Sequence, residues 1–203
     1  MNVSHVLYKA NHLEEAVQEF RDRGFTVEYG SRKNPHNALI YFSEGPYIEI
    51  LSKAPVSSVL LLLLRLIGQR KVADRFAHWK SVEEGFFGLC LETDKTDFVE
   101  EEEILKHHSQ RFFKTKSSRT DPSNRPLRWA LLFPHELQLP FMMTYFNIDP
   151  KPVAYVHPNG VRGIETITFG TDTRYFPIMA DLCEDPVLQI TDGRGVVEVL
   201  YHS

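Results

Sequence analysis

Residues 47–51 read YIEIL, a β-rich run with a single carboxylate, Glu49, at its centre. Side chains alternate across a strand, so Glu49 shares one face with Tyr47 and Leu51, while Ile48 and Ile50 lie on the other. Both faces are otherwise apolar, which predicts that Glu49 points into an interior. A carboxylate buried there has to be paired, protonated or bound to a metal ion.

The same pattern returns near the end of the chain, where residues 196–200 read VVEVL around Glu198. Two further strands match each other, SHVLY at residues 4–8 and IETIT at 164–168, and they place His5 and Glu165 at corresponding positions. A repeat of this kind indicates a fold built from copies of one supersecondary unit.

The spacing of apolar residues predicts two βαβββ modules, over residues 1–52 and 85–146, and a shortened βαββ module over 161–203. Residues 56–80 read as one inserted helix with its charges, including Arg75, on a solvated face. We therefore predict an α+β fold in which the repeated modules form a cupped mixed sheet. The predicted domains are 1–160 and the third module packed on it.

Composition excludes several classes of protein. The 203 residues carry a formal net charge of -4, which argues against nucleic-acid binding through a basic surface. Two distant cysteines and the lack of a leader-like start predict a reducing, cytoplasmic location. The apolar run at 59–64 is too short to span a membrane, so we expect a buried or partner-facing helix and no membrane partner.

The candidate ligands for a metal are His5, Glu49, Glu165 and Glu198, one imidazole and three carboxylates. This set suits a divalent ion such as Zn, Mn, Fe, Ni or Mg. Two plainer interpretations stay open at this point. His5 and Glu49 could be a hydrogen-bonded pair in a polar cavity, and Glu165 and Glu198 could face water on an edge strand.

The order of these motifs resembles the vicinal oxygen chelate superfamily, in its glyoxalase-like branch. Members typically place a His, Gln or Glu on the first strand and a Glu on the last strand of each module, all facing one metal. Four short motifs add to the resemblance: His36-Asn37-Ala38-Leu39, Leu127-Arg128-Trp129, Leu139-Pro140-Phe141 and His157-Pro158-Asn159-Gly160. The central module departs from the pattern, because its corresponding positions, near Leu89 and Met143, are apolar. Either the first and third modules share a metal, or the first and second form the cup and Glu165 and Glu198 lie elsewhere.

The resemblance implies a metal-dependent lyase, isomerase or dioxygenase that acts on a small oxygen-chelating substrate, with Glu49 or Glu198 as the base. The residues expected to bind the substrate are His36, Asn37, Arg128, Trp129 and His157. For two of them a structural role is equally open, a turn at His36 and an ion pair at Arg128, and for His157 a loop hydrogen bond is the favoured role. The alternative is a non-catalytic protein that binds a small molecule, of the antibiotic-binding type, in a cavity lined by aromatic residues. A third hypothesis makes residues 56–80 a partner surface, and a homodimer is expected in any case.

Overall fold

A computed structural model of the chain describes residues 1–53, 56–152 and 156–203. The first module contains five elements: β1 (Asn2–Lys9), α1 (Leu13–Asp22), β2 (Glu28–Tyr29), β3 (Asn37–Ile40) and β4 (Tyr47–Leu51). The second repeats their order: β5 (Gly85–Thr93), α4 (Val99–His107), β6 (Phe112–Thr120), β7 (Pro126–Pro134) and β8 (Phe141–Thr144). Both βαβββ modules are as predicted.

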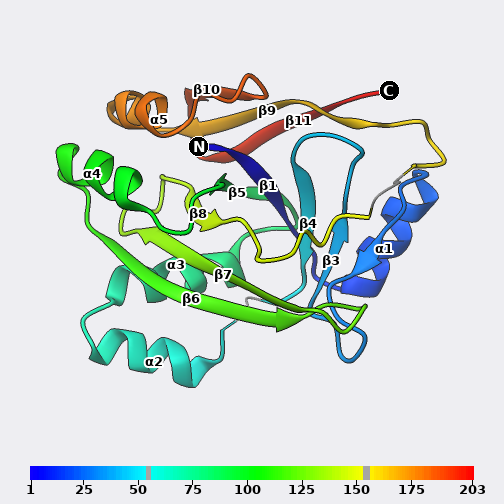
Figure 1. Ribbon diagram of the computed structural model, residues 1–203, viewed down its shortest axis with the longest axis horizontal. Helices are drawn as coiled ribbons and strands as arrows, with labels where there is room; N and C mark the ends of the chain where they lie inside the picture. The colour runs from blue at the N-terminus through cyan, green and yellow to red at the C-terminus, as the bar shows by residue number, and fades with distance from the viewer. Residues whose placement is uncertain (54–55, 153–155) are drawn as a thin grey trace.

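The two modules share one strongly curled, eight-stranded mixed sheet in the order β2-β3-β4-β1-β5-β8-β7-β6 (Figure 1). The strands β1 and β5 meet antiparallel at its centre, and each runs parallel to the last strand of its own module. His5 is paired with Tyr47 on β4 in the first module, and Cys90 is paired with Phe141 on β8 in the second. This symmetry settles the question left open by the sequence: the first and second modules form the cup.

The two faces of the sheet carry separate apolar clusters. Val6, Ile48 and Ile50 belong to the cluster on the convex face, which also holds the apolar sides of α1 and α4. Leu7 and Leu51, their neighbours in sequence, belong to the cluster on the concave face. The alternation expected around Glu49 is therefore confirmed, and Glu49 faces the concave side of the cup.

The segment between the modules forms two helices, α2 (Ser58–Leu66) and α3 (Arg70–Ser81), rather than the single helix predicted. The break is at Gly68, whose φ of +81° is the left-handed conformation that ends a helix. The Gly68 and Gln69 amides donate to the Arg65 and Leu64 carbonyls, as they do in a Schellman motif. The expectation of a fully solvated charged face is wrong at Arg75, which is buried.

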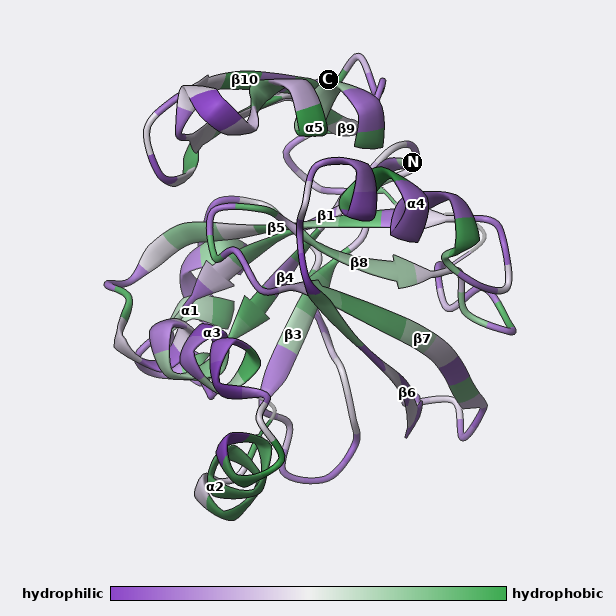
Figure 2. Ribbon diagram, turned by 90° about the vertical axis from the view of Figure 1, so that its left-hand side faces the viewer, coloured by the Kyte–Doolittle hydropathy of each residue, from purple (hydrophilic) through white to green (hydrophobic). Residues whose placement is uncertain are grey.

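The third module is a separate three-stranded sheet, made of β9 (Gly163–Thr171), β10 (Leu188–Asp192) and β11 (Gly195–His202) in the order β10-β9-β11, with the short helices η1 (Thr173–Tyr175) and α5 (Phe176–Leu182). It packs over the convex face, with β11 against β5, and lies at the end of the molecule opposite α2 (Figures 1 and 2). Its topology differs from that of the first module, because β11 is antiparallel to β9 whereas β4 is parallel to β1. The predicted correspondence between residues 47–51 and 196–200 is therefore wrong.

The turn from β10 to β11 crosses the end of β9 at Gly170. A Cβ atom there would lie 2.5 Å from the Arg194 amide nitrogen, which only glycine avoids. In the described part of the chain, no helix is long and apolar enough to cross a membrane.

Candidate functional site

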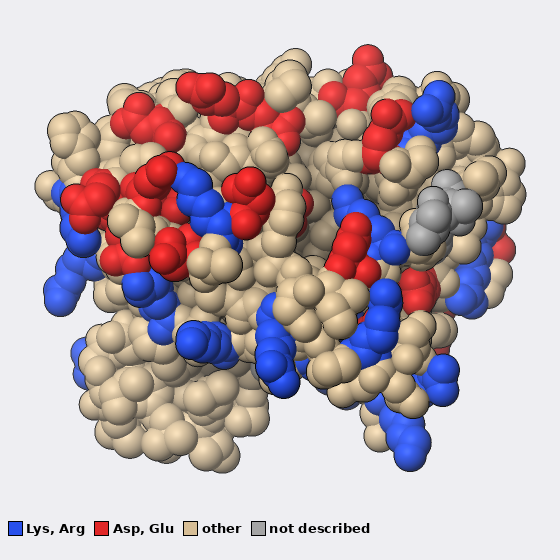
Figure 3. Space-filling model, in the orientation of Figure 1, with Lys and Arg blue, Asp and Glu red and all other residues tan. Residues whose placement is uncertain are grey.

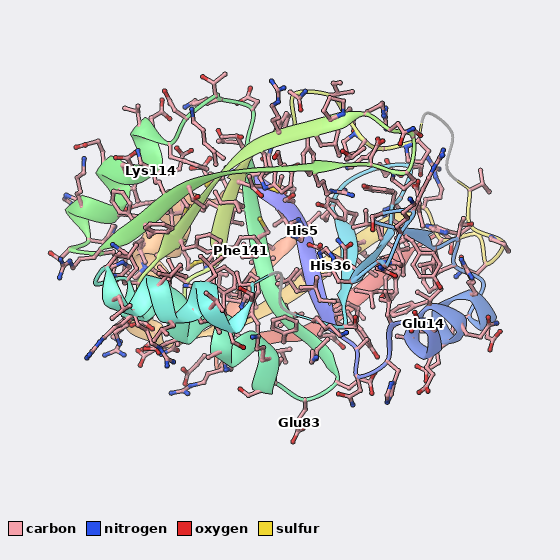
Figure 4. The ribbon with its side chains drawn as sticks, turned by 90° about the horizontal axis from the view of Figure 1, so that it is seen from below. His5, Glu14, His36, Glu83, Lys114 and Phe141 are labelled. Carbon is pink, nitrogen blue, oxygen red and sulfur yellow. The ribbon has the colours of Figure 1, made fainter. Side chains whose placement is uncertain are left out.

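The concave face holds a cavity of about 480 Å³, which we call the cup cavity. Its walls come from β1, β3 and β4 of the first module, from β6, β7 and β8 of the second, and from the inserted helices. In Figure 4, His5 and His36 lie together near the centre of the molecule with Phe141 close by, whereas Glu14 and Glu83 lie at the periphery. Most of the lining is apolar or aromatic, including Leu7, Leu51, Phe76, Trp79, Trp129 and Phe133. This is the lining expected of a site for a small molecule.

Three polar side chains of the first module converge on one wall of the cavity. The His5 Nε2 lies 3.3 Å from the Glu49 Oε2, and the Asn37 amide donates to the Glu49 Oε1 at 2.6 Å. The His5 ring is buried and stacks on Tyr47 with ring centroids 4.7 Å apart. These contacts fix the ring between a carboxylate and an aromatic face. We call His5 and Glu49 the dyad.

A second set of contacts orients the imidazole through its other nitrogen, Nδ1. The His5 Nδ1 lies 3.0 Å from the Ser4 hydroxyl, and that hydroxyl donates to Glu92 at 2.7 Å. A hydroxyl has one hydrogen, and here it is given to Glu92, so Ser4 accepts from a protonated His5 Nδ1. The other ring nitrogen, Nε2, is buried 3.3 Å from the Glu49 carboxylate, where it makes no aligned hydrogen bond among the described residues.

The charges around the dyad favour an ionised Glu49. Burial raises the pKa of Glu49, but the His5 contact, the Asn37 hydrogen bond and the charge of Arg119 together outweigh it and lower the pKa below its ordinary value. Burial also raises the pKa of the Tyr47 phenol well above its usual range, with the Glu49 charge as the next cause. The site therefore contains one carboxylate, one imidazole and a neutral phenol.

The wall opposite the dyad comes from the second module and carries no matching ligands. By the register of the paired strands, Cys90 occupies the place of His5, and Met143 that of Glu49. The first equivalent is thus Cys90 rather than Leu89, although Met143 was identified correctly. Burial raises the pKa of the Cys90 thiol well above its usual range, so it is a neutral thiol and a poor metal ligand.

The structure does not bring Glu165 and Glu198 to the dyad. Both are exposed, and they lie on β9 and β11 of the separate sheet, which packs on the convex face. Their predicted roles as metal ligands, and that of Glu198 as a base, are therefore contradicted. The cause is that the third module forms its own sheet on the convex face, which a match of short sequence patterns cannot reveal.

Three of the five predicted substrate-binding residues line the cup cavity, namely His36, Asn37 and Trp129. The other two do not. Arg128 is exposed, and its backbone amide donates to the Asn147 side chain. His157 accepts from the Thr26 amide through Nδ1 and packs between aromatic rings outside the cavity, as the loop interpretation predicted.

Two parts of the lining were not anticipated. Arg119 on β6 reaches the cavity and also donates to the Gly30 carbonyl. Phe76 and Trp79 enter from α3, which looked like a surface helix in the sequence. Their i, i+3 spacing was a signal that α3 has a buried face. Of the aromatic residues expected in a cavity, Tyr47, Trp129, Phe141 and Phe146 line it, whereas Tyr145 lies in a smaller pocket beside it.

The donor set does not fit a metal ion held by protein side chains alone. Catalytic zinc ordinarily has three protein ligands. The described residues include no group of three His, Cys, Asp or Glu side chains placed to share an ion. His5 and Glu49 supply two donors, and the facing positions supply a thioether and a buried thiol.

Comparison with known proteins agrees with this architecture. The profile of the glyoxalase-like domain family matches residues 3–177. No curated protein matches the sequence. Among solved structures, a hypothetical protein from Staphylococcus aureus has a TM-score of 0.64 at 15% identity, covering 96% of this chain and 87% of that one.

Two other structures are more distant. A Streptomyces coelicolor methylmalonyl-CoA epimerase in complex with 2-nitronate-propionyl-CoA has a TM-score of 0.43 at 15% identity, covering 71% of this chain and 96% of that one. A xylose isomerase-like TIM barrel/4-hydroxyphenylpyruvate dioxygenase fusion protein has a TM-score of 0.44 at 11% identity, covering 99% of this chain and 35% of that one. The family match extends over most of the sequence, and the paired βαβββ modules agree with it. The chain therefore belongs to the glyoxalase-like domain family of the vicinal oxygen chelate superfamily.

Proposed function

We propose that the chain binds a small, mainly apolar molecule in the cup cavity and holds its polar end at the His5–Glu49 dyad. The observation that carries this proposal is the dyad at the edge of an apolar cavity, where the buried Nε2 of His5 lies 3.3 Å from Glu49 Oε2 without an aligned hydrogen bond. A buried polar atom that is not fully hydrogen-bonded costs free energy, and a ligand atom at this position would remove that cost. Because the ionised Glu49 is an acceptor, the matching ligand group is an O–H or N–H donor.

The same geometry gives His5 a chemical role. A base has to lie within hydrogen-bond reach of the proton that it removes. A donor bound between Nε2 and Glu49 would meet that condition, and Ser4 and Glu92 would hold the ring in place. Glu49, ionised beside it, would stabilise the imidazolium that forms.

The test compares two ligands that differ by one hydrogen-bond donor, 2-naphthol and 2-methoxynaphthalene. Trp79 and Trp129 line the cavity, so their fluorescence reports binding. Wild-type protein should prefer the naphthol by about 2- to 13-fold, the equivalent of about 0.5–1.5 kcal/mol for one hydrogen bond. The His5→Phe variant keeps an aromatic ring against Tyr47 and should bind both compounds equally.

The control is Glu165→Gln, on the exposed face of the other sheet, which should leave the preference unchanged. If neither compound binds to the wild type, the proposal fails. If His5→Phe keeps the preference for naphthol, the polar end is bound elsewhere and the role of His5 is wrong.

The metal-dependent lyase, isomerase or dioxygenase predicted from the sequence is the second candidate. The observation in its favour is again His5, since a bare imidazole nitrogen is a common metal ligand. Elemental mass spectrometry for Zn, Mn, Fe and Ni tests it, with His5→Ala and Glu49→Ala beside Glu165→Ala. One ion per chain, lost only in the first two variants, would support a metal site completed by water or substrate.

The homodimer and the cytoplasmic location stay predictions, to be tested by sedimentation and by cell fractionation.

A further inference from the structure

The helix α2 exposes an apolar surface that the fold leaves uncovered. Of the thirteen large apolar side chains exposed in the described chain, six lie between Val59 and Ile67, and they are 42–73% exposed. These six, which we call the α2 patch, are Val59, Leu60, Leu62, Leu63, Leu66 and Ile67. Only Leu64 of this helix is buried. The apolar run is therefore not part of the buried core. An exposed apolar cluster of this size marks a surface that contacts another molecule or a membrane.

The position of α2 makes this surface accessible. The helix projects from the end of the molecule opposite the three-stranded sheet, and its ribbon is mostly hydrophobic (Figure 2). One side of the helix meets the cup cavity, because Leu64 lines the cavity wall together with Leu60 at the edge of the α2 patch. The helix is therefore part of the cavity wall.

The charges near α2 have a single dominant sign. Residues 53–73 contain four basic side chains, Lys53, Arg65, Arg70 and Lys71, and no Asp or Glu. All four are exposed, and Arg65 also pairs with the exposed Asp74 of α3 at 3.6 Å. In Figure 3 the acidic side chains gather on the upper half of the molecule, whereas lysines and arginines lie along the lower half beside the uncharged bulge of α2. The chain as a whole is acidic, so this basic rim is a local feature.

We propose that α2 docks on an anionic lipid surface, with the α2 patch in the boundary between headgroups and acyl chains and the basic rim against the headgroups. An apolar helix face bordered by Lys and Arg is the combination that binds such a surface. The run that was too short to span a bilayer is long enough to lie in its plane. The sequence did not predict a membrane partner, because it could not show that this helix is exposed.

A second copy of the chain fits the patch less well. Nine residues of helix are about 14 Å long and about 10 Å wide, a footprint of about 140 Å². A stable interface buries about 800 Å² on each partner. A two-fold pairing of α2 would also bring the basic rims of two copies together, and the neighbouring carboxylate, Asp74, already pairs with Arg65 of its own chain.

The test is co-sedimentation of the full chain with vesicles of phosphatidylcholine alone and with one quarter phosphatidylglycerol. Wild-type protein should bind the anionic vesicles at least tenfold more strongly, and salt should weaken that binding. Val59→Ser with Leu66→Ser should reduce it about tenfold or more, because both side chains lose their burial in the lipid. Arg70→Gln with Lys71→Gln should reduce it on anionic vesicles only.

Matched controls come from α4 and β11. Val99→Ser with Leu200→Ser removes apolar side chains that are exposed at 61% and 44%, and it should leave binding unchanged. Lys95→Gln with Lys106→Gln makes the same change in net charge on the other side of the molecule.

If wild type does not bind anionic vesicles, or if the α2 variants bind as wild type does, the proposal is overturned. A dimer in sedimentation that Val59→Ser with Leu66→Ser converts to monomer, without vesicle binding by wild type, would assign the patch to a second copy. Naphthol binding measured in parallel keeps this result separate from the proposed function.

Discussion

The guanidinium of Arg75 on α3 offers the sharpest test of how the inserted helices support the cavity. It is 4% exposed and donates to three backbone carbonyls, those of Pro134 at 2.9 Å, Glu136 at 2.6 Å and Leu139 at 3.0 Å. Pro134 ends β7, and the other two lie in its connection to β8, just before Phe141, which contacts the His5 ring. Burial lowers the pKa of Arg75 to about 10, so the group is still charged at neutral pH.

Replacing Arg75 with Met keeps an unbranched apolar stem and removes the guanidinium donor from all three carbonyls. Hydrogen bonds from a charged group contribute about 1.5–3 kcal/mol each, or about 4.5–9 kcal/mol for three. Burying the guanidinium costs several kcal/mol, which offsets part of this gain. We expect a net loss of about 3 kcal/mol, which lowers Tm by about 6–12 °C for a chain of this size.

Thermal unfolding followed by circular dichroism measures the change, and Arg70→Met, exposed at the start of the same helix, is the control. The loss of Arg75 should also weaken naphthol binding, since the loop that positions Phe141 becomes less fixed. A drop in Tm below about 2 °C would refute the reasoning, because it would mean that the three contacts contribute little beyond the cost of burying the charge.

Three further predictions concern other parts of the chain. The buried Asp121 accepts from the Ser123 and Arg125 amides and pairs with the Arg125 side chain. Burial raises its pKa, but these contacts outweigh it and lower the pKa below 3.8. The stability that Asp121 gives is therefore complete above pH 3.8 and is lost as the pH falls further. Asp121→Asn should cost about 1–3 kcal/mol in urea unfolding at pH 7 and less near pH 3; a difference independent of pH would contradict this. Gly170→Ala should cost about 1–3 kcal/mol, because the new Cβ meets backbone atoms at 2.5 Å, and Gly88→Ala should cost less, since it meets only the flexible Leu7 side chain at 3.0 Å. Equal Tm losses would show that the strand crossing relaxes. Met143→Glu supplies a carboxylate at the position equivalent to Glu49 and should give a zinc affinity that the wild type lacks, measured by elemental analysis after dialysis; no gain would mean that the two modules do not face one centre.

Much of the fold could be predicted because local patterns determine it. The alternation around Glu49 fixed the orientation of β4, and the repeat of strand and helix fixed both modules. The location of Glu165 and Glu198 could not be predicted, because a five-residue pattern does not record whether its strand runs parallel or antiparallel to its neighbour. Arg75 shows a second limit. Its spacing among charged residues indicated a surface, whereas three carbonyls on a distant loop determine its burial.

Only part of the candidate site could be predicted, because the sequence links residues within one module and not residues of distant elements. His5 and Glu49 lie on strands of one module, where sequence spacing and geometry are closely linked. Arg119, Phe76 and Trp79 reach the cavity from elements that are remote in sequence, so only the folded chain shows them together.

The antiparallel junction of β1 with β5 has a consequence for how the chain folds. It pairs Val3 with Leu91 and Leu7 with Gly88, residues that are more than 80 positions apart. Until β5 has been synthesised, β1 presents an unpaired edge that carries Val3, Val6 and Leu7, all of them buried in the finished protein. Contacts this distant in sequence slow folding and leave such edges open to other chains. The first module should therefore not fold by itself on the ribosome, and a fragment that ends before β5 should aggregate where the full chain stays in solution.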